Sequence, residues 1–182
     1  MFYKEKYPTN IQEGVWDAET CVRRQGGFVV DESTLPSDIK WLPKGAPLAY
    51  NSSTQKVVVC KTAKVYEAAA AQATSLKVEK GHLFKVGDKI GGSAISAINT
   101  TNKDFDTLTI AAISAKADKG AVLDDGNASK VVGLNYATIP LDGQQSCTPT
   151  LQAYEIEEDT LPYPLNAAIK TALSCRHAFK LD

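Results

Sequence analysis

Four cysteines and two histidines are the residues whose chemistry could make this chain a catalyst. Nucleophilic catalysis by cysteine needs a thiolate beside an imidazole, with a third group orienting the ring. Cys60 and His82 could meet in space, but no familiar nucleophile motif surrounds Cys60. Cys175 and His177 stand two residues apart on a predicted helix and would point to different sides. The sequence therefore favours cysteines that act as small buried apolar residues, and it predicts no catalytic residue.

The spacing of possible ligands predicts neither a metal site nor another cofactor. The cysteines Cys21, Cys60, Cys147 and Cys175 form no C-x-x-C pair, so a zinc site would need distant residues to converge. Residues 124–127 read Asp-Asp-Gly-Asn, but they lack the residue order and the downstream glutamate of an EF-hand loop. We expect this segment to be a turn between strands.

Other short motifs also favour ordinary structural interpretations. Asp104 and Asp106 are expected on a solvated strand edge, where charge discourages unwanted strand pairing. Residues 91–93 (Gly-Gly-Ser) match no phosphate-binding loop and predict a flexible hairpin. The pair Arg23 and Arg24 is too short to be a nucleic-acid patch.

Composition excludes several function classes. The 182 residues include 20 basic and 21 acidic side chains, so a net charge of −1 argues against direct binding to nucleic acid or anionic membranes. No apolar run approaches the ~18 residues of a membrane span. The first residues lack the apolar core of a signal peptide, so we expect free thiols in a reducing compartment.

Strand signals at short spacing dominate residues 51–140. Apolar or alternating runs at 57–60, 76–78, 107–110, 122–123 and 131–132 are separated by turn residues. This pattern predicts a mainly β fold, a small antiparallel β-barrel or sandwich.

The two ends are expected to differ from this β-rich domain. Residues 1–50 contain several prolines and many aromatic residues, and they predict an extended N-terminal arm that packs on its own domain or on a neighbouring chain. Residues 141–182 predict a connecting segment and a short helix at 165–179, whose apolar residues recur at helical spacing. Aromatic side chains are favoured interface anchors and equally good core residues, and the candidate contacts are Trp16, Phe28, Trp41 and Tyr50.

Four strings of the sequence resemble a known family. Residues 42–48, 57–64, 76–88 and 161–166 resemble the head-fibre and capsid-decoration proteins of tailed bacteriophages, particularly those of gut Bacteroidales. The distinctive string is Lys-Gly-His-Leu-Phe-Lys-Val-Gly-Asp at residues 80–88. At 182 residues the chain suits a short decoration or a stubby fibre base, not a long shaft.

The resemblance implies a structural protein of the virion without enzymatic activity. It would bind the major capsid protein on the outside of the shell, as a dimer or trimer, after assembly in the host cytoplasm. One alternative is a carbohydrate- or peptide-binding β module of a bacterial host. A small thiol hydrolase is the other alternative, and it would require one unusually reactive cysteine.

Overall fold

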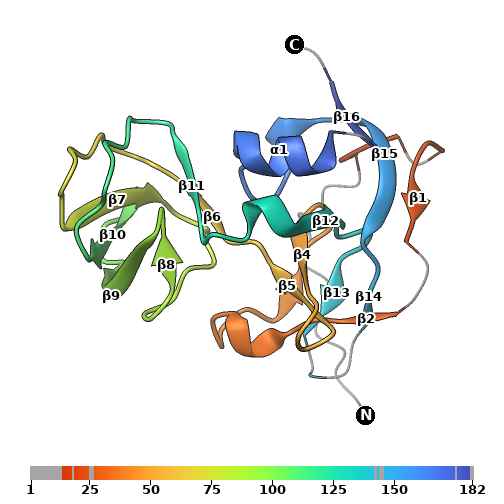
Figure 1. The fold of residues 1–182 in the computed structure, drawn as a ribbon, viewed down its shortest axis with the longest axis horizontal. Coiled ribbons are helices and arrows are strands. Elements are labelled where there is room, and N and C mark those ends of the chain that lie inside the picture. Colours follow the sequence, from red (N-terminus) through yellow and green to blue (C-terminus); the bar gives the residue numbers. More distant parts are fainter. Residues whose placement is uncertain are drawn as a thin grey trace.

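The protein folds into a larger body and a smaller lobe, which lie side by side in Figure 1. The fold is mainly β, as predicted, with antiparallel sheets and one α-helix among the residues that can be described. No helix within that part of the chain has the length and apolar character needed to cross a bilayer. The computed structural model describes residues 14–17, 19–24, 27–141, 143, 146–174 and 176–180.

The lobe is built from one continuous stretch of chain, residues 62–124. Its curled four-stranded antiparallel sheet has the strand order β7-β10-β9-β8 (Figure 1). Gly91 and Gly92 both have positive φ and form the two-residue turn between the last two of these strands. The strands are β7 (Ser75–Glu79), β8 (Lys89–Ile90), β9 (Ser93–Asn99) and β10 (Phe105–Ile110).

A two-stranded neck joins the lobe to the body. The chain enters the lobe along β6 (Thr62–Lys64) and leaves along β11 (Val122–Asp124), and these strands pair antiparallel. The lobe is thus an insertion between β5 (Lys56–Val59) and the 3-10 helix η2 (Ala128–Lys130). The compact unit differs from the predicted 51–140 domain, because an apolar cluster of its own lies within residues 63–123.

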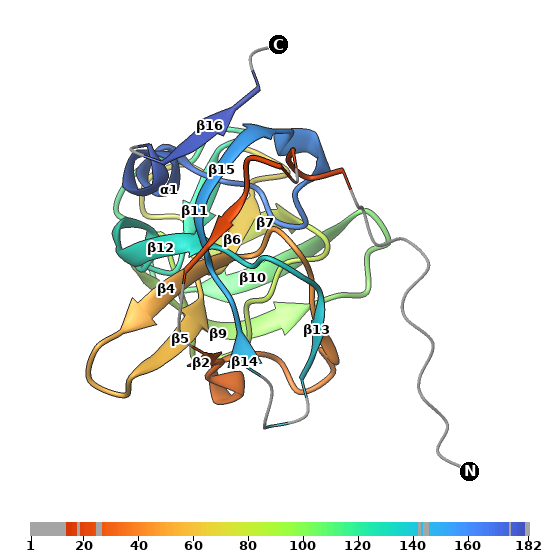
Figure 2. The same cartoon turned by 90° about the vertical axis from the view of Figure 1, so that its right-hand side faces the viewer.

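The body contains the remaining strands, grouped around two three-stranded sheets (Figure 2). In one sheet β4 (Pro47–Asn51) is central, between β5 and β12 (Val131–Leu134). In the other, β15 (Thr150–Ile156) lies between β1 (Val22–Arg23) and β16 (His177–Phe179). The other two-stranded pairs join β3 (Trp41–Leu42) to β13 (Ile139–Pro140) and β2 (Phe28–Val29) to β14 (Ser146–Cys147).

The segment predicted as an arm belongs to the body wherever the structure describes it. Val15, Leu42 and Leu48 are almost completely buried, and β4 is a central strand. The expected boundary at residue 50 falls inside the β4–β5 hairpin, because the apolar side chains before it complete the body's core. Residues 1–13 lie outside the described part of the chain.

The C-terminal helix is shorter than predicted. The α-helix α1 covers Ala167–Leu173, and the Asn166 side chain caps it by accepting the Ile169 backbone N–H at 2.9 Å. The predicted helix continued to residue 179, but residues 177–179 form β16, which pairs in parallel with β15. The edge of β15 provides hydrogen-bond partners for the main-chain N–H and C=O groups of these residues. In a helix the same groups would have paired with one another.

The close packing of β12 against β15 yields a prediction of stability. A Cβ atom on Gly133 would lie 2.1 Å from the Thr150 carbonyl oxygen, so Gly133→Ala must displace backbone. We expect a loss of about 3 kcal/mol in the free energy of unfolding, measured by urea denaturation. Gly14→Ala is the control, because a Cβ there has no neighbour within 4 Å. Equal stabilities of the two variants would contradict this packing.

Candidate functional site

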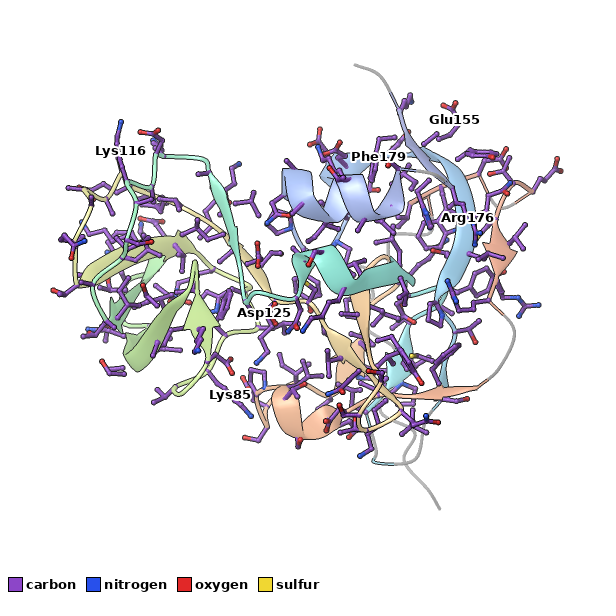
Figure 3. The ribbon with its side chains drawn as sticks, in the orientation of Figure 1. Lys85, Lys116, Asp125, Glu155, Arg176 and Phe179 are labelled. Atoms are coloured by element: carbon purple, nitrogen blue, oxygen red, sulfur yellow. The ribbon has the colours of Figure 1, made fainter. Side chains whose placement is uncertain are left out.

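A cavity lies where the lobe meets the body. Its volume is about 450 Å³, and Figure 3 labels Lys85 and Asp125 in this region. Both hydrogen-bond donors and acceptors line it, with one aromatic ring, that of Tyr50. We call it the junction cleft, and its lining residues are Thr34, Ala49, Tyr50, Asn51, Ser52, Ser53, Val58, Val59, Lys61, Asp88, Lys89, Asp125, Asn127 and Lys130.

A buried ion pair forms one wall of the junction cleft. The Lys61 side chain is 3% exposed, and its Nζ lies 2.5 Å from Asp88 Oδ2. The same ammonium group donates a hydrogen bond to the Thr34 carbonyl of the body. An ammonium group is costly to bury without partners, so both contacts are needed. They link the loop that carries Asp88 and the neck, which begins beside Lys61, to the body.

The loop 80–88 makes further contacts across the junction. Lys85 donates its backbone N–H to Asp88 Oδ2 at 2.8 Å, and its Nζ donates to the Ser33 carbonyl at 2.5 Å. Leu83 is buried in the body's core cluster, whereas its neighbour Phe84 is buried in the lobe's cluster. This loop, which we call the junction loop, therefore contributes to both cores. The sequence singled out the string but gave no sign that Lys61, 27 residues away, is its partner.

Asp106 corrects the expectation of a solvated strand edge. It lies on β10, an inner strand of the lobe's sheet, and is 6% exposed. Lys80 Nζ is 2.6 Å from Asp106 Oδ1, so burial of the carboxylate is compensated by an ion pair. The contact ties the start of the junction loop to the lobe. The alternating polar and apolar pattern of β10 did not reveal this partner.

His82 lies beside the same carboxylate. Its Nδ1 accepts the Phe84 N–H at 3.2 Å, so the proton of the neutral ring is on Nε2. Nε2 is 3.3 Å from Asp106 Oδ2 but lacks the alignment of a hydrogen bond. Burial lowers the pKa of His82, opposed by the Asp106 carboxylate and reinforced by Lys80. The neutral His82 ring therefore packs within the loop and accepts one of its main-chain N–H groups.

Burial suppresses the reactivity of the three described cysteines. Cys60 is fully buried and donates to Asp125 Oδ1 at 3.6 Å. Burial, followed by the nearby Asp125 and Asp124 carboxylates, raises the pKa of Cys60 far above its usual value. Burial raises the pKa of Cys147 to about 12 and also raises that of Cys21. The thiolate form is therefore disfavoured at all three positions.

The Asp-Asp-Gly-Asn segment is a turn, as predicted. Asp124 Oδ1 accepts the Gly126 N–H at 2.6 Å, and Asp125 Oδ1 accepts the Asn127 N–H at 3.0 Å. Asn166 at the start of α1 donates to Asp124 Oδ2 at 2.5 Å, which connects the neck to the helix. Within the described ranges, no cluster of three His, Cys, Asp or Glu residues could hold a metal ion.

The four predicted interface aromatics fall in different environments. Trp16 is 5% exposed in the core that α1 covers, and Lys44 Nζ lies 4.7 Å from its ring centre. Phe28 and Tyr50 are half-buried and meet edge to face at 6.1 Å. Trp41 is half-buried on β3. Phe28, Trp41 and Tyr50 therefore retain exposed surface, whereas Trp16 is a core residue.

No protein-family model, curated protein or solved structure matches this chain. The fold and junction geometry define a two-lobed, mainly β protein with a cavity of about 450 Å³ between its parts.

The Lys61–Asp88 pair yields a stability prediction. Asp88→Asn leaves the Lys61 ammonium buried with an uncharged partner, so we expect the free energy of unfolding to fall by about 3 kcal/mol. Asp118→Asn is the matched control, because its pair with Lys116 is exposed and should change stability by less than about 1 kcal/mol. Chemical denaturation at pH 7 measures both. If both variants lost equally little stability, the pair would not be holding the junction.

The buried histidines predict a pH dependence. Burial lowers the pKa of His82 and of His177 below the ordinary histidine value of 6.5, so the unfolded chain binds more protons in this range. Stability must therefore fall as pH decreases through 6.5. Urea denaturation at pH 7.5 and 5.5 measures the decrease, and His82→Gln should reduce it. A decrease unchanged by the substitution would exclude His82 as a contributor.

Proposed function

We propose that this protein is a structural component of a tailed-bacteriophage virion that binds the outside of the capsid shell as a decoration or head-fibre protein. The supporting observation is that all four strings that resemble this family contribute to one core cluster. They supply Leu42 and Leu48, Val57 and Val59, Leu83, and Tyr163. The resembling strings therefore meet in the core of the body, which Leu83 of the junction loop also enters.

In this proposal the body binds the shell and the lobe projects from it. Phe28 and Trp41 are half-buried aromatic residues of the body, and side chains of this kind are common interface anchors. The lobe is joined through the β6–β11 neck and the junction loop, so its far side stays open to solvent or to another partner. Copies that associate as dimers or trimers would add avidity on a lattice of identical subunits.

Capsid binding is tested with shells assembled from the major capsid protein of the same phage. We expect the protein to pellet with the shells, and Trp41→Ala to weaken binding at least about 30-fold, as for an aromatic hot spot. Tyr66→Ala is the control, because Tyr66 packs on Phe105 in the lobe, with ring centres 4.9 Å apart.

Circular dichroism must show both variants folded. Light scattering of the free protein tests the dimer or trimer against the 19.5 kDa mass of one chain. Absence of the wild-type protein from the pelleted shells would overturn the proposal, and a monomer would remove its oligomeric part. If Tyr66→Ala abolished binding while Trp41→Ala did not, the lobe would be the part that faces the shell.

A carbohydrate-binding module is the second candidate, favoured by the junction cleft. Its mixed donors and acceptors and the half-buried Tyr50 ring suit a polyhydroxylated ligand. Saturable binding of a glycan by the free protein, lost in Tyr50→Ala, would support this function. The two functions are compatible if the cleft faces away from the shell.

A further inference from the structure

A second cavity of the body has a lining of one charge sign. Its volume is about 290 Å³, and Arg24, Arg176 and His177 line it together with apolar side chains. No carboxylate is among the described residues of the lining. Figure 3 shows Arg176 on the side of the body away from the lobe, so this cavity is separate from the junction cleft. Its apolar lining is Val131, Val132, Leu151, Ala172 and Leu173.

Main-chain contacts fix the positions from which the two arginines extend. The Arg24 backbone N–H donates to the Pro149 carbonyl at 2.9 Å. The Arg176 backbone N–H donates to the Leu173 carbonyl at 3.1 Å, and its own carbonyl accepts the Ala153 N–H at 3.1 Å. The two guanidinium groups thus start from opposite walls, one after β1 and the other between α1 and β16.

One polar atom beside this cavity lacks a partner. Arg24 Nε is buried and makes no hydrogen bond with any residue the structure describes. His177 is 6% exposed, and its ring is paired with the Thr150 hydroxyl at 2.9 Å and with the backbone carbonyl of Leu173. Buried polar groups are nearly always hydrogen-bonded, so the unpaired Nε indicates that the Arg24 guanidinium group has a donor to spare for a ligand.

Thr150 and Leu173 hold the ring of His177. Thr150 Oγ1 accepts the Leu134 N–H at 2.9 Å and lies 2.9 Å from His177 Nε2. The backbone carbonyl of Leu173 can only accept, so Nδ1 carries the ring proton and Nε2 accepts the Thr150 hydroxyl hydrogen. Burial lowers the pKa of His177, opposed by the Leu173 carbonyl and reinforced by Arg176, which favours this neutral form.

We propose that this cavity binds an oxyanion, a phosphate or carboxylate group, through the guanidinium groups of Arg24 and Arg176. The planar guanidinium group presents paired N–H donors that match the oxygen spacing of phosphates and carboxylates. The rest of the described lining is largely apolar, so these guanidinium groups are its charged contacts. This site is independent of capsid binding and of the junction cleft.

Titration with inorganic phosphate tests the site, with sodium chloride at equal ionic strength as the reference. We expect saturable binding by calorimetry at pH 7, and chemical-shift changes concentrated at Arg24, Arg176 and His177. Arg176→Gln and Arg24→Gln should each weaken binding at least tenfold. Arg23→Gln is the matched control, because that neighbouring guanidinium lies 5.0 Å from the Tyr136 ring centre and outside the cavity.

Arg176 is exposed, so its substitution tests the site even if Arg24→Gln fails to fold. A parallel titration with acetate distinguishes the two sources of the oxyanion. Binding of phosphate alone assigns a phosphate group, whereas comparable binding of acetate assigns a carboxylate such as an acidic side chain. Absence of saturable binding of either anion would overturn the proposal, as would equal weakening by Arg23→Gln.

Discussion

The burial of one ammonium group, that of Lys61, constrains how the two parts of this protein are joined. The group lies almost entirely out of water, where a lone charge is not tolerated. Its partners come from different places, a carboxylate of the lobe and a carbonyl of the body. Both must be in position at once, so the pair sets the relative placement of the lobe and the body with a specificity that apolar contact lacks. Leu83 and Phe84 extend this constraint, since two adjacent side chains enter two different cores.

The junction also connects the proposed functions. A decoration protein must hold any projecting part at a fixed angle to the shell, and the junction loop supplies that rigidity. The same loop brings Asp88 to the junction cleft, so the cleft exists only while the lobe is docked. The oxyanion site depends on other elements, the end of α1 and the edge of β15. The two cavities therefore differ in chemistry and share no described lining residue.

The β-rich class and five of its strands, all within residues 51–140, were predictable from local patterns. Runs such as 57–60 and 107–110 became β5 and β10, because alternating or β-branched residues suit a half-buried strand. The end of the helix was not predictable, because residues 177–179 pair with β15, which is distant in sequence. Asp106 and Lys61 were missed for a related reason. A charged residue in a sequence gives no indication that a distant partner will bury it.

The insertion of the lobe also dictates an order of events during synthesis. The lobe's core cluster lies within one stretch of chain, and its neck strands can pair as soon as residue 124 has emerged. The body cannot complete its folding at that stage, because Val15 and Trp16 share a core with residues of α1 near the end of the chain. Early body segments must stay soluble on the ribosome while the lobe folds, with apolar strands such as β4 and β5 still uncovered. The lobe, placed mid-chain and complete in itself, is thus the first folded unit to which the rest of the nascent protein can attach.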